Sequence, residues 1–93
     1  MPPLNLDAET RTVVCRGERH ALNKREFALL SVLAEAAGAT VQSRTLLETV
    51  WGPNAEPPNL RVAIGGLRRK LEEDPELPTL ILTEPGVGYR LAR

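Results

Sequence analysis

Apolar positions recur along this chain with two different periods, and each period predicts its own kind of element. Over residues 24–37, 44–51 and 59–73 the apolar side chains return every three or four positions, which is typical of helices with one buried side. Over residues 4–22 and 79–92, short runs of aliphatic and β-branched residues are separated by polar or glycine-containing turns, which is typical of antiparallel strands. The pattern predicts an α+β fold with an N-terminal antiparallel sheet, three helices and a C-terminal β-hairpin.

Capping residues indicate where the first two helices begin. Asn23 and Glu26 have the spacing of a capping box, in which each side chain bonds the other residue's backbone N–H, so a helix is expected to start at Lys24. Gly38 suits the left-handed position after the last turn of that helix. Ser43 is expected to cap the second helix through its side chain.

The third helix combines a core side with a cluster of cations. Its apolar residues step by four, three and four positions and therefore share one side: Leu60, Ile64, Leu67 and Leu71. Arg69 is expected to point away from the core, Arg61 and Arg68 to flank it, and Lys70 to lie nearer the outer side. Residues 57–71 contain no acid, whereas four acids follow within residues 72–76. This segregation favours contact with a phosphate backbone, although cations near a helix C-terminus also suit the helix dipole.

Three prolines lie between residues 52 and 58, so a continuous helix there is excluded and a loop is expected. Pro57 and Pro58 suit the first positions of the helix that follows. The element order is therefore strands, helix, helix, proline-rich loop, basic helix and hairpin, which predicts one winged helix-turn-helix domain over residues 1–93. A recognition helix at about residues 59–73 would enter the major groove, and a wing at residues 80–92 would meet the backbone or the minor groove.

Composition narrows the possible functions. The formal net charge is zero, which argues against a strongly basic nucleic-acid binder and keeps open a winged helix that binds a protein instead. A continuous positive strip across Arg44, Arg68, Arg69 and Arg90 would favour DNA over that alternative. Cys15 is the only cysteine, so no internal disulfide or cysteine metal cluster is expected, and its thiol should be buried and inert.

Other classes of function have no support in the chain. There is no glycine-rich phosphate loop and no paired Ser/His or Cys/His, so we expect neither an enzyme nor a cofactor or metal site. No apolar run approaches the roughly 20 residues of a membrane span, and residues 1–4 lack the features of a signal peptide. A cytoplasmic protein without a membrane partner is expected.

Four blocks of sequence resemble the signature blocks of the OmpR/PhoB-type DNA-binding domain, in that family's order and spacing. They are Leu22–Leu30, Leu46–Gly52, Ile64–Leu71 and Thr83–Arg90. The resemblance implies the effector domain of a bacterial two-component response regulator that controls transcription. It implies a phosphoacceptor receiver domain before the effector domain, a sensor kinase, and paired binding to tandem repeats in promoter DNA. Because this chain has no room for a receiver, we expect an effector domain alone.

The same resemblance implies roles for individual residues. Near the DNA backbone it places Trp51, Arg68, Thr83, Tyr89 and Arg90. Near bases or adjacent phosphates it places Asn59, Arg61, Val62, Gly65, Gly66 and Arg69. Arg44, Lys70 and Gly86 complete the expected DNA-binding set. Trp51 could equally anchor the core, and Tyr89 could simply cover the hairpin. The loop that can touch RNA polymerase in the family corresponds to Pro53, Asn54, Ala55 and Glu56.

Two departures from the family affect how bases would be read. Gly65 and Gly66 are expected on the outer side of the third helix, where two glycines cost roughly 1 kcal/mol each relative to alanine. They either bend the helix or let its backbone approach the duplex closely. Pro85 stands at the wing tip, where some relatives carry an arginine, so the wing is expected to contact phosphates more than bases.

Overall fold

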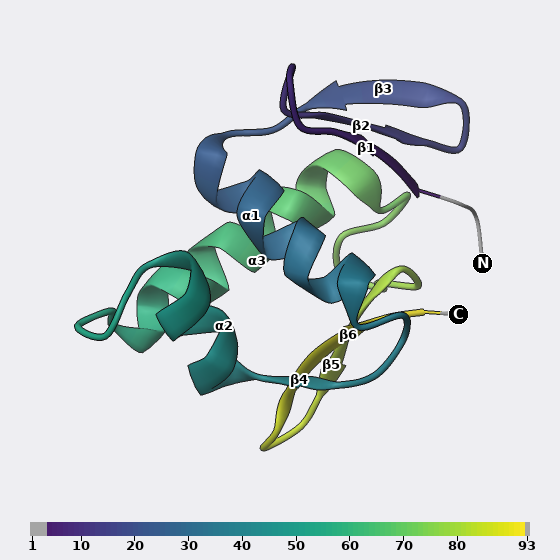
Figure 1. Ribbon diagram of the computed structural model, residues 1–93. Helices are drawn as coiled ribbons and strands as arrows, with labels where there is room; N and C mark the ends of the chain where they lie inside the picture. The colour runs from purple at the N-terminus through teal and green to yellow at the C-terminus, as the bar shows by residue number, and fades with distance from the viewer. Residues whose placement is uncertain (1–3, 93) are drawn as a thin grey trace.

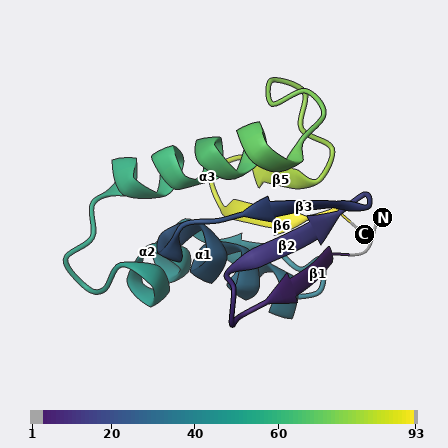
Figure 2. The same cartoon turned by 90° about the horizontal axis from the view of Figure 1, so that it is seen from above.

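The computed structural model describes residues 4–92 as two small sheets around three helices (Figure 1). The elements are β1 (Leu4–Asp7), β2 (Thr12–Cys15), β3 (Glu18–Ala21), α1 (Lys24–Glu35), β4 (Val41–Gln42), α2 (Ser43–Val50), α3 (Pro57–Leu71), β5 (Ile81–Glu84) and β6 (Gly88–Leu91). The N-terminal sheet is antiparallel with order β1-β2-β3 and lies beside α1 and α3. Figure 2 shows α3 running along one edge of the molecule. The predicted α+β fold is confirmed.

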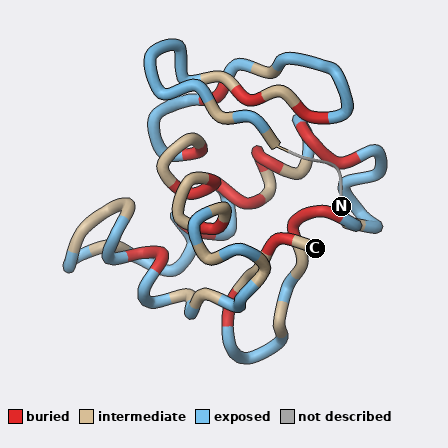
Figure 3. The backbone as a smooth tube through the Cα atoms, turned by 45° about the vertical axis from the view of Figure 1, so that its right-hand side comes forward, coloured by how far each residue is buried: buried red, intermediate tan, exposed pale blue. Residues whose placement is uncertain are grey.

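The core lies where the three helices meet the two sheets. Its fully buried side chains come from both sheets and from the helices, and they include Val13, Leu29, Leu33, Leu46 and Ile81. In Figure 3 the buried stretches face the centre, while the tips of the turns are exposed. The predicted core side of the third helix is confirmed, since its four residues are all buried. Cys15 is buried as predicted, and burial raises the pKa of its thiol.

The wing is part of a sheet rather than a free hairpin. Val41 and Gln42 form β4, which pairs with β6 to give the order β4-β6-β5. The backbones approach so closely that a Cβ built on Gly88 would lie 2.0 Å from the carbonyl oxygen of Val41. The Ser43 N–H donates to the Val87 carbonyl at 3.1 Å. Glycine at position 88 therefore lets α2 begin directly against the wing.

The helix ends agree only partly with the predicted caps. The capping box is confirmed: Glu26 N–H donates to Asn23 Oδ1 at 2.8 Å, and Asn23 N–H donates to Glu26 Oε1 at 3.0 Å. Gly38 has the predicted positive φ, 93°. The predicted side-chain cap by Ser43 is wrong, because Gln42 is the N-cap residue and Ser43, tied to the wing, is already helical.

The third helix spans Pro57–Leu71 rather than residues 59–73, because both prolines occupy its first turn and the chain becomes extended at Glu72. The Glu72 carboxylate is buried and accepts backbone N–H groups from Thr79 at 3.0 Å, Leu80 at 3.1 Å and Ile81 at 2.7 Å. This carboxylate fixes the start of the wing against the end of α3. Glu72, one of the four acids that follow the basic helix in the sequence, thus has a structural role.

We predict that Glu72→Gln lowers the free energy of unfolding by about 1.5–3 kcal/mol, because an amide replaces a charged acceptor of three N–H groups. Urea denaturation measures the change. Glu73→Gln, at the exposed neighbouring position, removes the same charge and should stay within about 0.5 kcal/mol of the parent. Equal losses in the two variants would contradict this role for Glu72.

Candidate nucleic-acid interface

The outer side of α3 presents a short stripe of exposed side chains. Arg61, Val62 and Arg69 are all exposed, and Val62 retains 71% of its accessible surface although it is apolar. Asn59 is exposed on the first turn of the same helix. Within residues 4–92, neither Arg61 nor Arg69 forms a hydrogen bond or an ion pair through its side chain. Two unpartnered guanidinium groups and one exposed valine thus lie on the side of α3 that faces away from the core.

The centre of this stripe is not bare. The prediction that Gly65 and Gly66 both lie on the outer side is wrong for Gly66, which is buried against α1. A Cβ on Gly66 would lie 2.5 Å from Glu26 Oε2, whereas a Cβ on Gly65 would lie 3.5 Å from Arg69 Nη1. The guanidinium of Arg69 therefore lies back over the two glycines, and Gly66 provides space for a carboxylate from the core side.

Lys70, predicted to lie nearer the outer side of α3, is exposed, but its ammonium group is bonded within the molecule. Its Nζ donates to Glu26 Oε1 at 2.6 Å and to the Ala21 carbonyl at 3.1 Å. The Glu26 side chain also belongs to the capping box of α1, so Lys70 joins α3 to the start of α1 and to the end of β3. The position of Lys70 on the α1 side of α3 explains this pairing, and its charge is neutralised within the molecule.

Arg68 connects α3 to the wing. Its Nη2 donates to the Ile81 carbonyl at 2.8 Å and to Thr83 Oγ1 at 2.8 Å. Its guanidinium carbon also lies 5.8 Å from the centroid of the Tyr89 ring. Arg68 thus contacts both Thr83 and Tyr89, two residues that the resemblance, like Arg68, places near the DNA backbone.

The other predicted cations lie beside acids. Arg90 Nε donates to Glu84 Oε2 at 2.6 Å within the wing sheet, and Arg44 lies 3.4 Å from Glu48 on the exposed side of α2. The strip expected across Arg44, Arg68, Arg69 and Arg90 is thus interrupted by carboxylates and by internal bonds. Of these four cations, Arg69 is the one that forms neither an ion pair nor a side-chain hydrogen bond among residues 4–92.

A polar depression of about 440 Å³ lies between α2, α3 and the wing. Its lining includes Ser43 at the start of α2, Arg61 from α3, and Thr83, Gly86 and Tyr89 from the wing. No side chain of the described residues caps the N-terminus of α2, so that end offers free backbone N–H groups. The depression combines donors and one unpaired guanidinium with the Glu84 carboxylate, which is bonded to Arg90.

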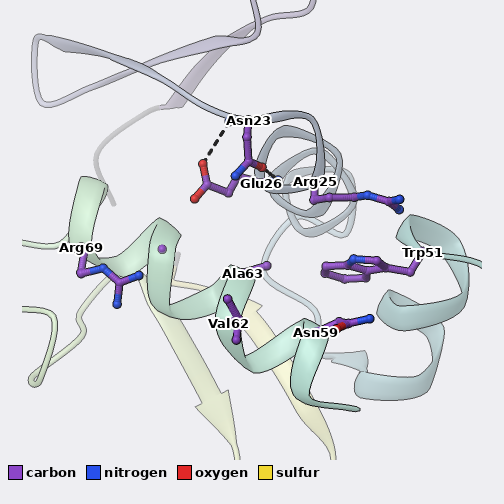
Figure 4. Close-up of a pocket in the computed structure, with 9 residues that line it drawn as sticks. Asn23, Arg25, Glu26, Trp51, Asn59, Val62, Ala63 and Arg69 are labelled. Carbon is purple, nitrogen blue, oxygen red and sulfur yellow. Dashed lines mark hydrogen bonds between the residues drawn. The ribbon is translucent and has the colours of Figure 1, made fainter. Parts of the chain in front are cut away.

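A second hollow, the α1–α3 groove, has a volume of about 400 Å³ (Figure 4). It is lined by Asn23, Arg25, Glu26, Trp51, Asn59, Val62, Ala63, Gly66 and Arg69. Trp51 packs against the core, as one of its two readings expects, and it also lines this groove. Arg25 lies 5.8 Å from the centroid of the Trp51 ring, and its Nη1 donates to the Val50 carbonyl at 2.5 Å.

Arg25 was not predicted as a functional residue. The capping box places it in the first turn of α1, but its contact with Trp51 joins positions far apart in the sequence. The loop between α2 and α3 was predicted, and it leads into the first turn of α3, whereas Arg68 lies in the last turn (Figure 1). Its residues Pro53, Asn54 and Glu56 are exposed, while Ala55 packs on the core.

Residues 4–92 contain neither a candidate membrane span nor a candidate metal-binding cluster. No helix there is long and apolar enough to cross a membrane. No group of three or more His, Cys, Asp or Glu side chains is placed there to hold a metal ion.

Three helices, a sheet-bound wing and an exposed cationic side on the third helix define a winged helix-turn-helix domain. A family profile described as "Transcriptional regulatory protein, C terminal" matches residues 17–91. The chain belongs to that family, whose domains are of the OmpR/PhoB type, and is therefore a transcription-regulator domain rather than an enzyme. The predicted resemblance is confirmed.

Individual relatives support the assignment. The KDP operon regulator KdpE of Escherichia coli is 48% identical over 81 residues, a match covering 84% of this chain and 36% of KdpE. The response regulator DrrB of Thermotoga maritima superposes with a TM-score of 0.85 at 40% identity, covering 97% of this chain and 42% of DrrB. The RstA DNA-binding domain of Klebsiella pneumoniae, solved with the RstA box, has a TM-score of 0.83 at 33% identity. The match covers 96% of this chain and 90% of the RstA chain. This chain thus spans well under half of the full-length KdpE and DrrB.

The two adjacent glycines give a matched pair of variants. Gly65→Ala should raise the free energy of unfolding by up to about 1 kcal/mol, because it gains helix propensity and its methyl group meets only ordinary contacts. Gly66→Ala should lower it by about 1–2 kcal/mol, because the methyl group displaces Glu26 from the capping box and from Lys70. Thermal unfolding measures both, and shifts of the same sign would contradict the packing of Gly66.

Proposed function

We propose that this domain binds double-stranded promoter DNA in a sequence-specific manner as the effector domain of a two-component response regulator. The observation that carries the proposal is the exposed stripe of Arg61, Val62 and Arg69, which has no acidic partner in the described chain. A helix fits the major groove, which is about 12 Å wide, and base edges are distinguishable there. The 33% identical RstA DNA-binding domain, solved in complex with the RstA box, supports DNA binding by this domain.

Each exposed side chain of α3 suits a different contact. Arg61 can donate two hydrogen bonds to guanine, Asn59 can pair with adenine, and Val62 can pack on a thymine methyl group. Arg69, which lies over the two glycines, can reach a base or the adjacent phosphate. We leave Gly66 and Lys70 out of the contact set because both are used in packing against Glu26.

The wing would position the domain rather than read sequence. Free N–H groups at the start of α2 and side chains around the polar depression can bind a phosphate there. Thr83 and Tyr89 line the depression together with Gly86, while Arg44 on α2 and Arg90 in the wing are further candidate phosphate contacts. Arg68 would act by holding the wing against α3 through Ile81 and Thr83. Exposed Pro85 at the turn offers no donor for the minor groove.

In the whole protein, the proposal includes a receiver domain, a sensor kinase and tandem promoter repeats, and it places the protein in the cytoplasm. KdpE and DrrB are more than twice as long as this domain, which leaves room for a receiver in a protein of that kind. The loop of Pro53, Asn54, Ala55 and Glu56 is a candidate contact for RNA polymerase. Its exposed residues lie away from the wing, so they would stay accessible on DNA.

The alternative, a winged helix that binds only proteins, is less well supported. The interrupted cation strip would favour it, but the exposed side of α3 carries two cations and no acid. If few phosphates are neutralised, zero net charge is compatible with DNA binding, and the salt dependence should be shallow.

Selection of bound sites from random duplexes, followed by fluorescence anisotropy at several salt concentrations, tests the proposal. We expect an enriched sequence and a slope of log affinity against log salt of roughly −2 to −3, corresponding to about three phosphates per domain. The absence of enrichment, together with a flat salt response, would overturn DNA binding and favour the protein-binding alternative.

Two neighbouring cations should behave differently in that assay. Arg69→Ala should make the salt slope shallower by about 0.9, since one phosphate contact is lost, and should leave stability nearly unchanged. Lys70→Ala should leave the slope unchanged and lower the free energy of unfolding by about 1–2 kcal/mol, because buried Glu26 loses its partner. If Lys70→Ala reduces the slope as much as Arg69→Ala does, the assignment of Lys70 to packing is wrong.

A further inference from the structure

The rim of the α1–α3 groove carries two guanidinium groups from two different helices. Arg25 comes from the first turn of α1 and Arg69 from the last turns of α3, and both are exposed (Figure 4). Glu26 is the acid among the described lining residues, but only 5% of its surface is exposed and its carboxylate is bonded to Lys70. The groove therefore offers two positive charges to solvent without an available negative one.

The groove also lies on the opposite side of α3 from the wing. Arg61 and Arg68 face the wing, since one lines the polar depression and the other bonds Ile81. Gly66 and Lys70 face α1 through Glu26. A helix inserted in the major groove has a phosphate backbone along each of its sides. The wing would meet one backbone, and the α1–α3 groove would meet the other.

We propose that Arg25, held by Trp51, binds a phosphate of the DNA strand that the wing does not contact. This inference rests on the proposed function and adds a contact to it. The guanidinium is already ordered, because one Nη donates to the Val50 carbonyl and the group lies over the indole ring. Its remaining N–H groups can form charge-assisted, bidentate hydrogen bonds with a phosphate. A pre-ordered donor loses less conformational entropy on binding than a free arginine.

An acidic protein segment would be recognised by the same charges. DNA is the better occupant because the groove is continuous with the exposed stripe: Val62, Arg69 and Asn59 belong to both. A duplex seated on α3 would therefore bring a phosphate to Arg25 without a second binding event.

The experiment uses Trp51, the only tryptophan of the chain, as a local reporter. The domain is titrated with its selected duplex while tryptophan emission and anisotropy are recorded at several salt concentrations. We expect duplex binding to change the emission of the parent. Arg25→Ala should weaken binding about fivefold or more and make the salt slope shallower by about 0.9. Arg25→Lys, which keeps the charge, should restore the slope but only part of the affinity.

Lys24→Ala is the matched control, since it removes the same charge one residue away from an exposed position that is not among the groove's lining residues. It should leave the slope unchanged. Ethylation interference with the parent domain provides a measurement that needs no variant, and it should identify sensitive phosphates on both strands flanking the selected site. Urea denaturation of Arg25→Ala checks that the loss of the Val50 bond leaves the fold intact.

Normal duplex binding by the parent with equal slopes for Arg25→Ala and Lys24→Ala would overturn this inference alone. Ethylation interference confined to the DNA strand that the wing contacts would also overturn this inference alone. A change in emission with poly-glutamate but none with the duplex would assign the groove to a protein partner instead. If the parent binds no duplex, the proposed function fails, and this inference fails with it.

Discussion

The arrangement of this domain depends on one buried carboxylate, that of Glu26. Its Oε1 accepts both the Asn23 N–H, closing the capping box of α1, and the Nζ of Lys70 on α3. Its other oxygen fills the space that Gly66 leaves on the same helix. A carboxylate this buried is stable only when its acceptors are satisfied, so α3 has little freedom to rotate against α1. The orientation of α3 about its own axis determines which of its side chains face outward. The orientation held by Glu26 leaves Arg61, Val62 and Arg69 exposed.

The wing is fixed to the same helix by two further polar contacts. Arg68 bonds the start of β5, and Glu72 accepts three backbone N–H groups just before and within that strand. β4 and the start of α2 then join the wing through Gly88 and Val87. The recognition helix and the wing thus form one rigid surface, so a duplex would be bound with little reordering of the protein. Arg68 and Glu72 look available in the sequence, but both are used to build this surface. Few of the charged groups on the surface are therefore unpaired.

Features that depend on neighbouring residues could be predicted from the sequence. The capping box of Asn23 and Glu26 lies within one turn, and the core side of α3 follows from a regular period. Features that depend on contacts between distant segments could not. Nothing in the local pattern pairs Lys70 with Glu26, inserts that carboxylate beside Gly66, or places Arg25 over Trp51. A helix period assigns residue 66 to a flank, but whether a flank is exposed depends on the element packed beside it, here α1.

The central claim is that packing around Glu26 selects the stripe of α3 that meets DNA. An NMR titration of the isotope-labelled domain with its selected duplex tests this claim most directly, since it observes every residue in one experiment. We expect the largest chemical-shift changes at Arg61, Val62 and Arg69 and in the wing. The signal of the Lys70 ammonium group should show that this group stays bonded to Glu26 throughout the titration. Changes centred on the N-terminal sheet, or release of Lys70 from Glu26 on binding, would contradict this claim.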